Sequence, residues 1–113
     1  MYLIINFIKD FIREIKFAFQ RAFRGFDDSA YWSLDFYLTK TIIPVLEFYR
    51  DEGSGHPVSL TEKQWKSKLN KMIKAFSLIK EENNRAEVLT KKELEAINKG
   101  LKEFADYYRN LWN

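Results

Sequence analysis

Leu60-Thr61-Glu62-Lys63-Gln64-Trp65 and Leu89-Thr90-Lys91-Lys92-Glu93-Leu94 are the two stretches that decide the fold of this chain. Each contains a threonine that is followed three residues later by Gln or Glu, which is the pattern of a helix capping box. An apolar residue precedes each threonine and another follows it by four positions, as in a hydrophobic staple. The two motifs fix where two helices begin, so the apolar residues after them can be read in register.

Apolar residues recur at alternating steps of three and four in both of these segments and in two earlier ones. The spacing predicts helices at about 2–24, 29–52, 62–82 and 91–111. We therefore expect an all-α, small four-helix bundle-like domain formed by residues 1–113 as a single unit. Within it, residues 1–24 are a basic amphipathic first helix and residues 25–113 form the remaining helical region.

Three residues modify this simple picture. Pro44 lies inside the second predicted helix, where it removes a backbone hydrogen bond, so we expect a kink between Lys40 and Pro44. Phe17 falls off the apolar stripe of the first helix and is predicted to be exposed. Gly100 lies in the middle of the last helix, where it is expected to let a neighbouring helix or a large aromatic side chain approach closely.

The composition narrows the classes of function. The chain has no cysteine, which excludes disulfides, thiolate metal sites and a cysteine nucleophile and fits a reducing cytoplasm. The net charge of +3 lies entirely in residues 1–24, which hold five basic and two acidic side chains. Because no other face is basic, the charge argues against nucleic acid as a partner. No apolar run is long enough to cross a bilayer, and no signal peptide is recognised.

The first segment has more than one interpretation. Its Phe- and Ile-rich face is expected to form the fourth wall of the bundle. Alternatively, because five basic side chains flank that face, residues 1–24 lie on a membrane surface or bind a partner. A broad apolar face also suits self-association into a homo-oligomer.

Asp35 is the most unusual residue of the second predicted helix, because the stripe from Tyr31 to Tyr49 places this acid within an apolar seam. A buried carboxylate needs a partner or a proton, and Arg24, Lys71 or an indole N–H group is expected to supply it. The structural interpretation is a buried, hydrogen-bonded acid that sets helix register. The functional interpretation is an acid that binds a ligand in a pocket with Trp32, His56 and Trp65. In the third interpretation the stripe is misassigned and Asp35 is solvated.

His56 is the only histidine and lies in the turn Gly53–Pro57. It is expected to be a loop residue with local hydrogen bonds, and its alternative role is contact with a ligand or partner. A single histidine without cysteine does not make a conventional zinc site, and no phosphate-binding glycine loop is present. We therefore expect no catalytic residue, no metal and no cofactor.

A set of short motifs in the order and spacing of this chain resembles a family of small, mostly uncharacterised helical proteins of tailed phages and prophages. The resemblance covers about four-fifths of the chain, from Arg24 onward, and leaves the first segment outside it. The pieces that carry it are Arg24-Gly25-Phe26-Asp27-Asp28, Tyr31-Trp32-Ser33-Leu34-Asp35, Ile42-Ile43-Pro44-Val45-Leu46, Gly55-His56-Pro57, Leu60-Thr61-Glu62 with Trp65, Met72-Ile73, Ala75-Phe76, Gly100-Leu101, Phe104-Ala105 and Leu111-Trp112.

The resemblance implies a product that acts in the cytoplasm of a bacterial host, and it supplies no catalytic residue to transfer. The favoured hypothesis is a non-enzymatic phage accessory protein that binds a host protein, such as a defence component. The best surfaces for that partner are the Gly53–Pro57 turn and the face of the first helix. The alternatives are a small-molecule binder that sequesters a nucleotide signal near Asp35, and a membrane-surface protein that uses residues 1–24.

Overall fold

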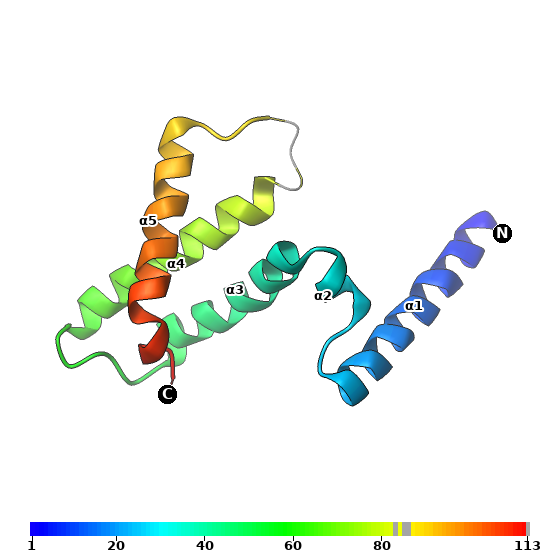
Figure 1. Cartoon of the computed structure of the whole chain (residues 1–113), viewed down its shortest axis with the longest axis horizontal. Coiled ribbons are helices and arrows are strands. Elements are labelled where there is room, and N and C mark those ends of the chain that lie inside the picture. The colour runs from blue at the N-terminus through cyan, green and yellow to red at the C-terminus, as the bar shows by residue number, and fades with distance from the viewer. Residues whose placement is uncertain (83, 85–86, 113) are drawn as a thin grey trace. The chain divides into compact units, whose positions relative to one another are not determined.

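The fold is all-α, as predicted. The computed structural model describes residues 1–82, 84 and 87–112, and within these ranges it has helices and no strand. The helices are α1 (Tyr2–Arg24), α2 (Asp28–Trp32), α3 (Leu34–Glu52), α4 (Glu62–Glu82) and α5 (Lys91–Tyr107), followed by the 3-10 turn η1 (Tyr108–Asn110) (Figure 1).

The chain divides into two compact units, Met1–Tyr37 and Leu38–Asn113, which we call the N-terminal and C-terminal units. The N-terminal unit holds α1, α2 and the first turn of α3. The C-terminal unit holds the rest of α3 together with α4, α5 and η1. Two predictions depend on how the units join: that the chain is one domain, and that residues 1–24 form a fourth wall of the bundle. Both stay predictions.

The two capping boxes form as predicted. The Gln64 backbone N–H donates to Thr61 Oγ1 over 3.1 Å, and the Thr61 N–H donates to Gln64 Oε1 over 2.9 Å. Thr90 and Glu93 repeat this exchange with the same two distances. Of the two staples, Leu60 and Trp65 both join the core, whereas Leu94 is exposed and leaves Leu89 to pack with other residues.

Removing the Thr90 hydroxyl by Thr90→Ala is expected to lower the free energy of unfolding of the C-terminal unit by about 1 kcal/mol. The Glu93 backbone N–H then loses the hydrogen bond that it donates to the Thr90 hydroxyl at the start of α5. Urea unfolding followed by circular dichroism measures the change. Thr90→Ser, which keeps the hydroxyl, is the matched control and should stay close to the parent protein.

The core of the C-terminal unit is formed by side chains of α3, α4 and α5. Its buried side chains are Leu46 of α3 and Trp65, Leu69, Met72 and Phe76 of α4. The Trp65 ring meets the edge of Tyr107 from α5, with ring centroids 5.7 Å apart. At the rim of this core, Lys68 Nζ and Glu103 Oε1 form an ion pair of 2.9 Å between α4 and α5.

α5 crosses α4 closely at Gly100, which confirms the role expected of this glycine (Figure 1). Gly100 is buried, and a Cβ atom added to it would overlap the Lys71 carbonyl oxygen and the Ala75 methyl group. Because the obstruction includes backbone atoms of α4, a larger residue cannot be accommodated by a side-chain rotation alone.

The predicted second helix is wrong in one important respect, because it breaks at Ser33. Ser33 has extended backbone angles of φ −153° and ψ 84°, which end α2 and begin α3. Its carbonyl accepts a hydrogen bond from the Tyr37 N–H, so a new helix starts immediately after it. α3 then continues through Pro44 to Glu52, and the kink expected at the proline stays a prediction.

Candidate functional site

α2 packs on the polar side of α1, at the position where Phe17 interrupts the charged residues. Phe17 is the only buried residue of α1, and its side chain is 7% exposed. Its ring meets the edge of the Trp32 indole with centroids 5.6 Å apart. The prediction that Phe17 is exposed is therefore wrong, because α2 covers the side of α1 opposite to the apolar stripe.

Asp27 is the buried acid of the N-terminal unit, and it anchors α2 to α1. The Asp27 side chain accepts a hydrogen bond of 2.6 Å from Arg21 Nη1 and one of 2.9 Å from the Ser29 backbone N–H. The Ser29 hydroxyl donates to the same carboxylate. These donors explain how a carboxylate of which 1% is exposed remains ionised.

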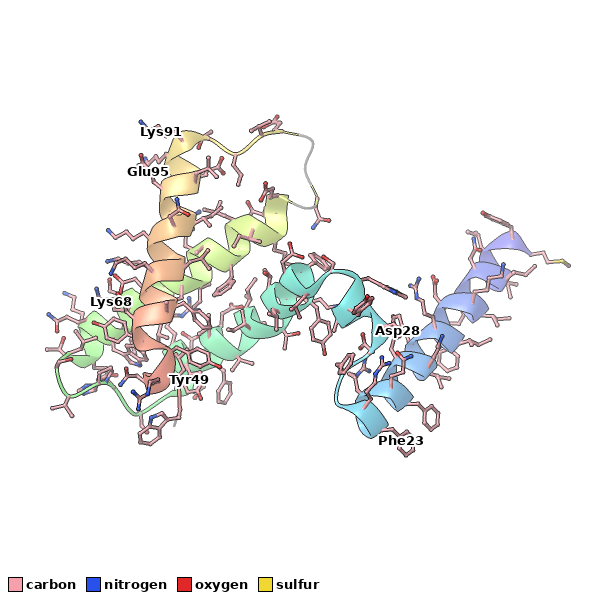
Figure 2. The ribbon with its side chains drawn as sticks, viewed as in Figure 1. Phe23, Asp28, Tyr49, Lys68, Lys91 and Glu95 are labelled. Carbon is pink, nitrogen blue, oxygen red and sulfur yellow. The ribbon has the colours of Figure 1, made fainter. Side chains whose placement is uncertain are left out.

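Asp28 adds a second link between the same two helices. Gln20 Nε2 donates to its carboxylate over 2.9 Å, Arg24 Nη2 donates over 3.0 Å, and the Asp28 backbone N–H returns a bond of 2.9 Å to Gln20 Oε1. In Figure 2 the Asp28 side chain lies on the α2 side of the last turns of α1. Asp27 and Asp28 thus pair with basic residues of α1, and they hold its polar side against α2.

The carboxyl pKa of Asp27 lies below its ordinary value of 3.8, chiefly because the Ser29 hydroxyl donates to it, while burial acts in the opposite direction. A depressed native pKa contributes stability that is present above pH 3.8 and is lost as the pH falls through the lower native value. We expect the Ser29 amide resonance to keep its native position at pH 3.8 and to move only on further acidification. A nuclear magnetic resonance titration with a midpoint at or above 3.8 would contradict this.

The opposite side of α1 is a broad apolar surface that is exposed along the whole helix. At 3.6 residues per turn, its side chains span an arc of about 160°. Figure 2 shows one of them, Phe23, projecting outward from the last turn of the helix. We call this surface the α1 apolar face, and its exposed members are Ile4, Ile5, Phe7, Ile8, Phe11, Ile12, Ile15, Phe19 and Phe23.

The charge of the N-terminal unit is balanced once residues 25–37 are included. Residues 1–37 contain five basic and five acidic side chains, so the excess found in residues 1–24 is cancelled by Asp27, Asp28 and Asp35. Lys9 and Lys16 lie beside the apolar face at one edge, since they follow Ile5 and Ile12 by four positions. The distinctive property of this unit is therefore its amphipathic geometry rather than a high net charge.

The structure places the four residues predicted to line a pocket in four different settings. Trp32 and Asp35 belong to the N-terminal unit, where Trp32 packs on Phe17 and Asp35 accepts a 2.7 Å hydrogen bond from the Ser33 hydroxyl. Trp65 is buried in the core of the C-terminal unit, which confirms its expected packing role. His56 is exposed in its turn, with Nδ1 lying 3.0 Å from the Pro57 carbonyl.

Asp35 is exposed, so the expectation of a buried acid at this position is wrong. The break at Ser33 makes Asp35 a first-turn residue of α3, where a carboxylate interacts favourably with the positive end of the helix dipole. The carboxyl pKa is lowered by the Ser33 hydroxyl first and by the Phe36 backbone amide second. Both of these donors are local to the start of α3.

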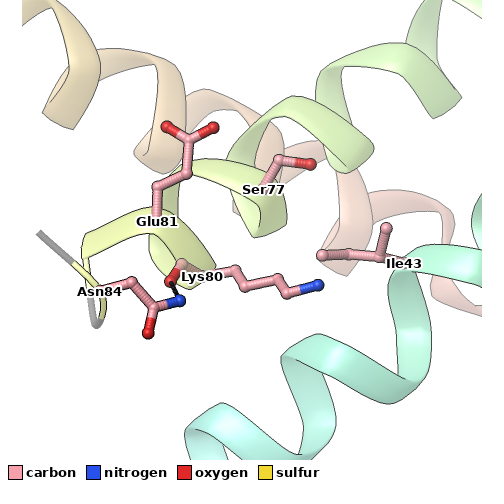
Figure 3. Close-up of a pocket in the computed structure, with 5 residues that line it drawn as sticks. All are labelled: Ile43, Ser77, Lys80, Glu81 and Asn84. Atoms are coloured by element: carbon pink, nitrogen blue, oxygen red, sulfur yellow. Dashed lines mark hydrogen bonds between the residues drawn. The ribbon is translucent and has the colours of Figure 1, made fainter.

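The C-terminal unit has a small pocket beside His56 and a larger hollow between α3 and the end of α4, which is drawn in Figure 3. A pocket of 160 Å³ lies between the Gly53–Pro57 turn and the C-terminal residues Asn110 and Trp112, and His56 lines it. A larger, open hollow of 530 Å³ lies between Ile43 of α3 and the end of α4. In Figure 3 the Lys80 chain extends along this hollow toward Ile43, and Asn84 Nδ2 donates to the Lys80 carbonyl over 3.4 Å.

Sequence reasoning missed Asp27, and it did so although a signal was present. Asp27 caps α2 through the Ser29 amide, which is a role that its place before a helix permits. Arg21 lies six residues earlier, across the turn at Gly25, whose φ of 86° ends α1 and reverses the chain. In this chain the glycine that ends α1 reverses the backbone, so the two acids that follow it pair with basic residues in the last turn of α1.

The described residues offer neither a metal site nor a membrane-spanning helix. Among the described residues, no group of three or more His, Cys, Asp or Glu side chains is placed to hold a metal ion. Within the same residues, no helix has the length and apolar character needed to cross a membrane. In comparisons with known proteins, no family model, curated protein or solved structure matches this chain.

Proposed function

We propose that this protein is a non-enzymatic binding protein that attaches to a lipid membrane surface through the α1 apolar face. The observation that carries the proposal is that α2 binds the polar side of α1 and leaves the apolar face uncovered within the N-terminal unit. In line with the resemblance to phage proteins, we place this attachment on the cytoplasmic side of the membrane of a bacterial host.

The width of the face favours a lipid surface over a single partner helix. A helix that packs on one neighbour in a coiled coil needs only a narrow apolar seam, and a core-facing helix needs a stripe of about 100° or more. The arc of about 160° on α1 instead suits a helix that lies in the plane of a bilayer with half of its circumference immersed. Its phenylalanines are large enough to reach the acyl boundary, and Lys9 and Lys16 are placed to extend toward lipid headgroups.

Sedimentation of the full chain with vesicles of phosphatidylcholine and phosphatidylglycerol tests the proposal. The parent protein is expected to bind saturably, and Phe11→Gln/Ile15→Gln is expected to stay in the supernatant. The matched control is Phe48→Gln/Val58→Gln, which removes one aromatic and one aliphatic exposed side chain from the C-terminal unit and should bind like the parent. Equal binding by both double variants would contradict the proposal.

Analytical ultracentrifugation without lipid separates the membrane from a second copy of the chain. If the α1 apolar face binds lipid, the parent protein is expected to sediment as a monomer at low micromolar concentration. A stable dimer that Phe11→Gln/Ile15→Gln converts to a monomer, together with no vesicle binding, would show that a second copy covers the face.

A protein partner is the second candidate, because one observation favours a separate surface for it. The exposed side chains of His56 and Trp112 line the same pocket, and tryptophan is a frequent anchor in protein interfaces. We propose that a host protein, such as a defence component, binds there. Affinity capture from the host should identify a protein that binds the parent chain and is lost with His56→Ala and with Trp112→Ala. If both variants still capture that protein, this role is contradicted.

A further inference from the structure

A groove between α4 and α5 brings together three lysines of the C-terminal unit, Lys71, Lys74 and Lys99. The groove has a volume of 310 Å³, which is at the lower end of the range for small-molecule pockets. Its lining contains three lysines, a hydroxyl and a carboxamide, and it contains no carboxylate. The lining residues are Ser67, Asn70, Lys71 and Lys74 from α4 and Ala96 and Lys99 from α5.

The groove brings together three lysines that form no ion pair within the described residues, whereas two neighbouring lysines of α4 and α5 are paired. Lys68 pairs with Glu103 over 2.9 Å, and Lys102 pairs with Asp106 over 2.8 Å. Within the described part of the chain, no ion pair involves Lys71, Lys74 or Lys99. Glu95, which Figure 2 labels, precedes Lys99 by one turn of α5, and it is not among the residues that line the groove.

Like charges on one helical face lower stability, so this arrangement is unfavourable without an anion. Lys71 and Lys74 are three residues apart on α4, which places them on the same face, and Lys99 approaches them from α5. The carboxamide of Asn70 and the hydroxyl of Ser67 add hydrogen-bond donors to the same groove. A multiply charged anion bound in the groove would relieve this repulsion.

The tight helix crossing beside the groove keeps its walls in place. Gly100 packs against the Lys71 carbonyl, so the α4 residue that carries one of the lysines is held against α5 next to Lys99. Because the backbones cannot separate without losing this contact, the spacing of the backbone positions that carry the lysines is set before a ligand arrives. Such preorganisation reduces the entropic cost of binding.

We propose that the groove is a binding site for the phosphate groups of a small polyanion. Lysine is a common phosphate ligand because its ammonium group is a compact charge with three donors. Three lysines, with the donors of Ser67 and Asn70, match two or three linked phosphates better than a single monovalent anion. The inference stands on contacts of the C-terminal unit alone and is independent of the membrane function proposed for α1.

Calorimetric titration of the full chain with inorganic triphosphate tests the site. We expect saturable one-to-one binding, and we expect Lys71→Gln/Lys74→Gln/Lys99→Gln to weaken it at least tenfold. The matched control, Lys63→Gln/Lys91→Gln/Lys92→Gln, removes the same charge from exposed positions outside the groove and should weaken binding less than threefold. Equal weakening by both triple variants, or no saturable binding by the parent, would overturn the proposal.

Two further measurements keep the result interpretable. Amide resonances of Ser67, Asn70 and Ala96 in the parent protein should shift with triphosphate, and shifts confined to other parts of the chain would overturn the site without relying on any variant.

Vesicles of phosphatidylglycerol identify the source of the phosphate. Weaker vesicle binding by the groove variant than by its control, with α1 intact, assigns the groove to lipid headgroups, and equal vesicle binding assigns it to a free polyanion. Tight binding of single-stranded RNA without any binding of triphosphate would replace the proposal with a nucleic acid site.

Discussion

Gly100→Ala is expected to destabilise the C-terminal unit by about 2 kcal/mol, because the new methyl group overlaps atoms of the neighbouring helix. The sign of this change is diagnostic. Replacing an interior helical glycine by alanine at an exposed site gains about 1 kcal/mol of stability from helix propensity. Here the obstruction is the Lys71 carbonyl and the Ala75 methyl group, so α4 and α5 must move apart. Gly100→Val should cost more, since its branches meet the same backbone.

Urea unfolding followed by circular dichroism measures both variants against the parent. The control is Asn98→Ala, an exposed change in the same helix that should raise stability by about 0.5 kcal/mol through helix propensity alone. If Gly100→Ala proves as stable as Asn98→Ala, the close crossing of α4 and α5 is wrong. If the Gly100→Val protein shows no helical circular dichroism signal, it has not folded, which agrees with the expected loss of stability.

Phe19→Gln is expected to lower vesicle affinity at least tenfold, whereas Phe17→Ala is expected to leave it unchanged. The two phenylalanines are two positions apart, so they point to different sides of α1. Phe19 belongs to the α1 apolar face and is 61% exposed. Immersing a phenylalanine contributes roughly 1.5–3 kcal/mol, and each 1.4 kcal/mol corresponds to about a tenfold change in affinity.

Phe17→Ala should act on the N-terminal unit itself. Its ring packs on Trp32, so its loss is expected to shift the Trp32 indole resonance and to loosen α2. Phe19→Gln should leave that resonance at its native position. The opposite pattern, with vesicle affinity following Phe17 and the indole resonance following Phe19, would mean that α2 lies on the other side of α1.

The parts of the fold that the sequence predicted correctly are those set by neighbours in the chain. The helix starts at Thr61 and Thr90 depend on a side chain and a backbone amide three residues apart, so their pattern is visible in the sequence. Gly100 was recognisable because a glycine is costly in a helix interior and therefore suggests a close approach. Trp65 followed from its place four residues after a cap.

The errors come from interactions that helical periodicity does not report. The stripe from Tyr31 to Tyr49 continues through Ser33 on paper, but the Ser33 carbonyl caps a new helix and turns Asp35 into a surface residue. Burial was consequently assigned to Asp35 instead of Asp27, whose partner Arg21 lies across a turn. The lysine groove was missed for a related reason, since it joins Lys71 and Lys74 to a residue of another helix.

For the candidate surface, the sequence predicted the apolar face but not what covers it. Periodicity shows that Phe11 and Phe19 share a side of the helix, and it is equally compatible with a core, a partner or a bilayer. The structure adds that α2 packs on the other side, around Phe17 and Asp27. Only a tertiary contact distinguishes a helix whose apolar face is covered from one whose apolar face is exposed.

The most direct test of membrane attachment measures which side of α1 enters the lipid. The chain has no cysteine, so Phe11→Cys and Arg13→Cys each give a single site for an environment-sensitive fluorophore. With saturating phosphatidylcholine and phosphatidylglycerol vesicles, the label at position 11 should report an apolar environment about 5–10 Å deep and the label at position 13 should remain in water. Labels at both positions that report water would contradict attachment through the α1 apolar face.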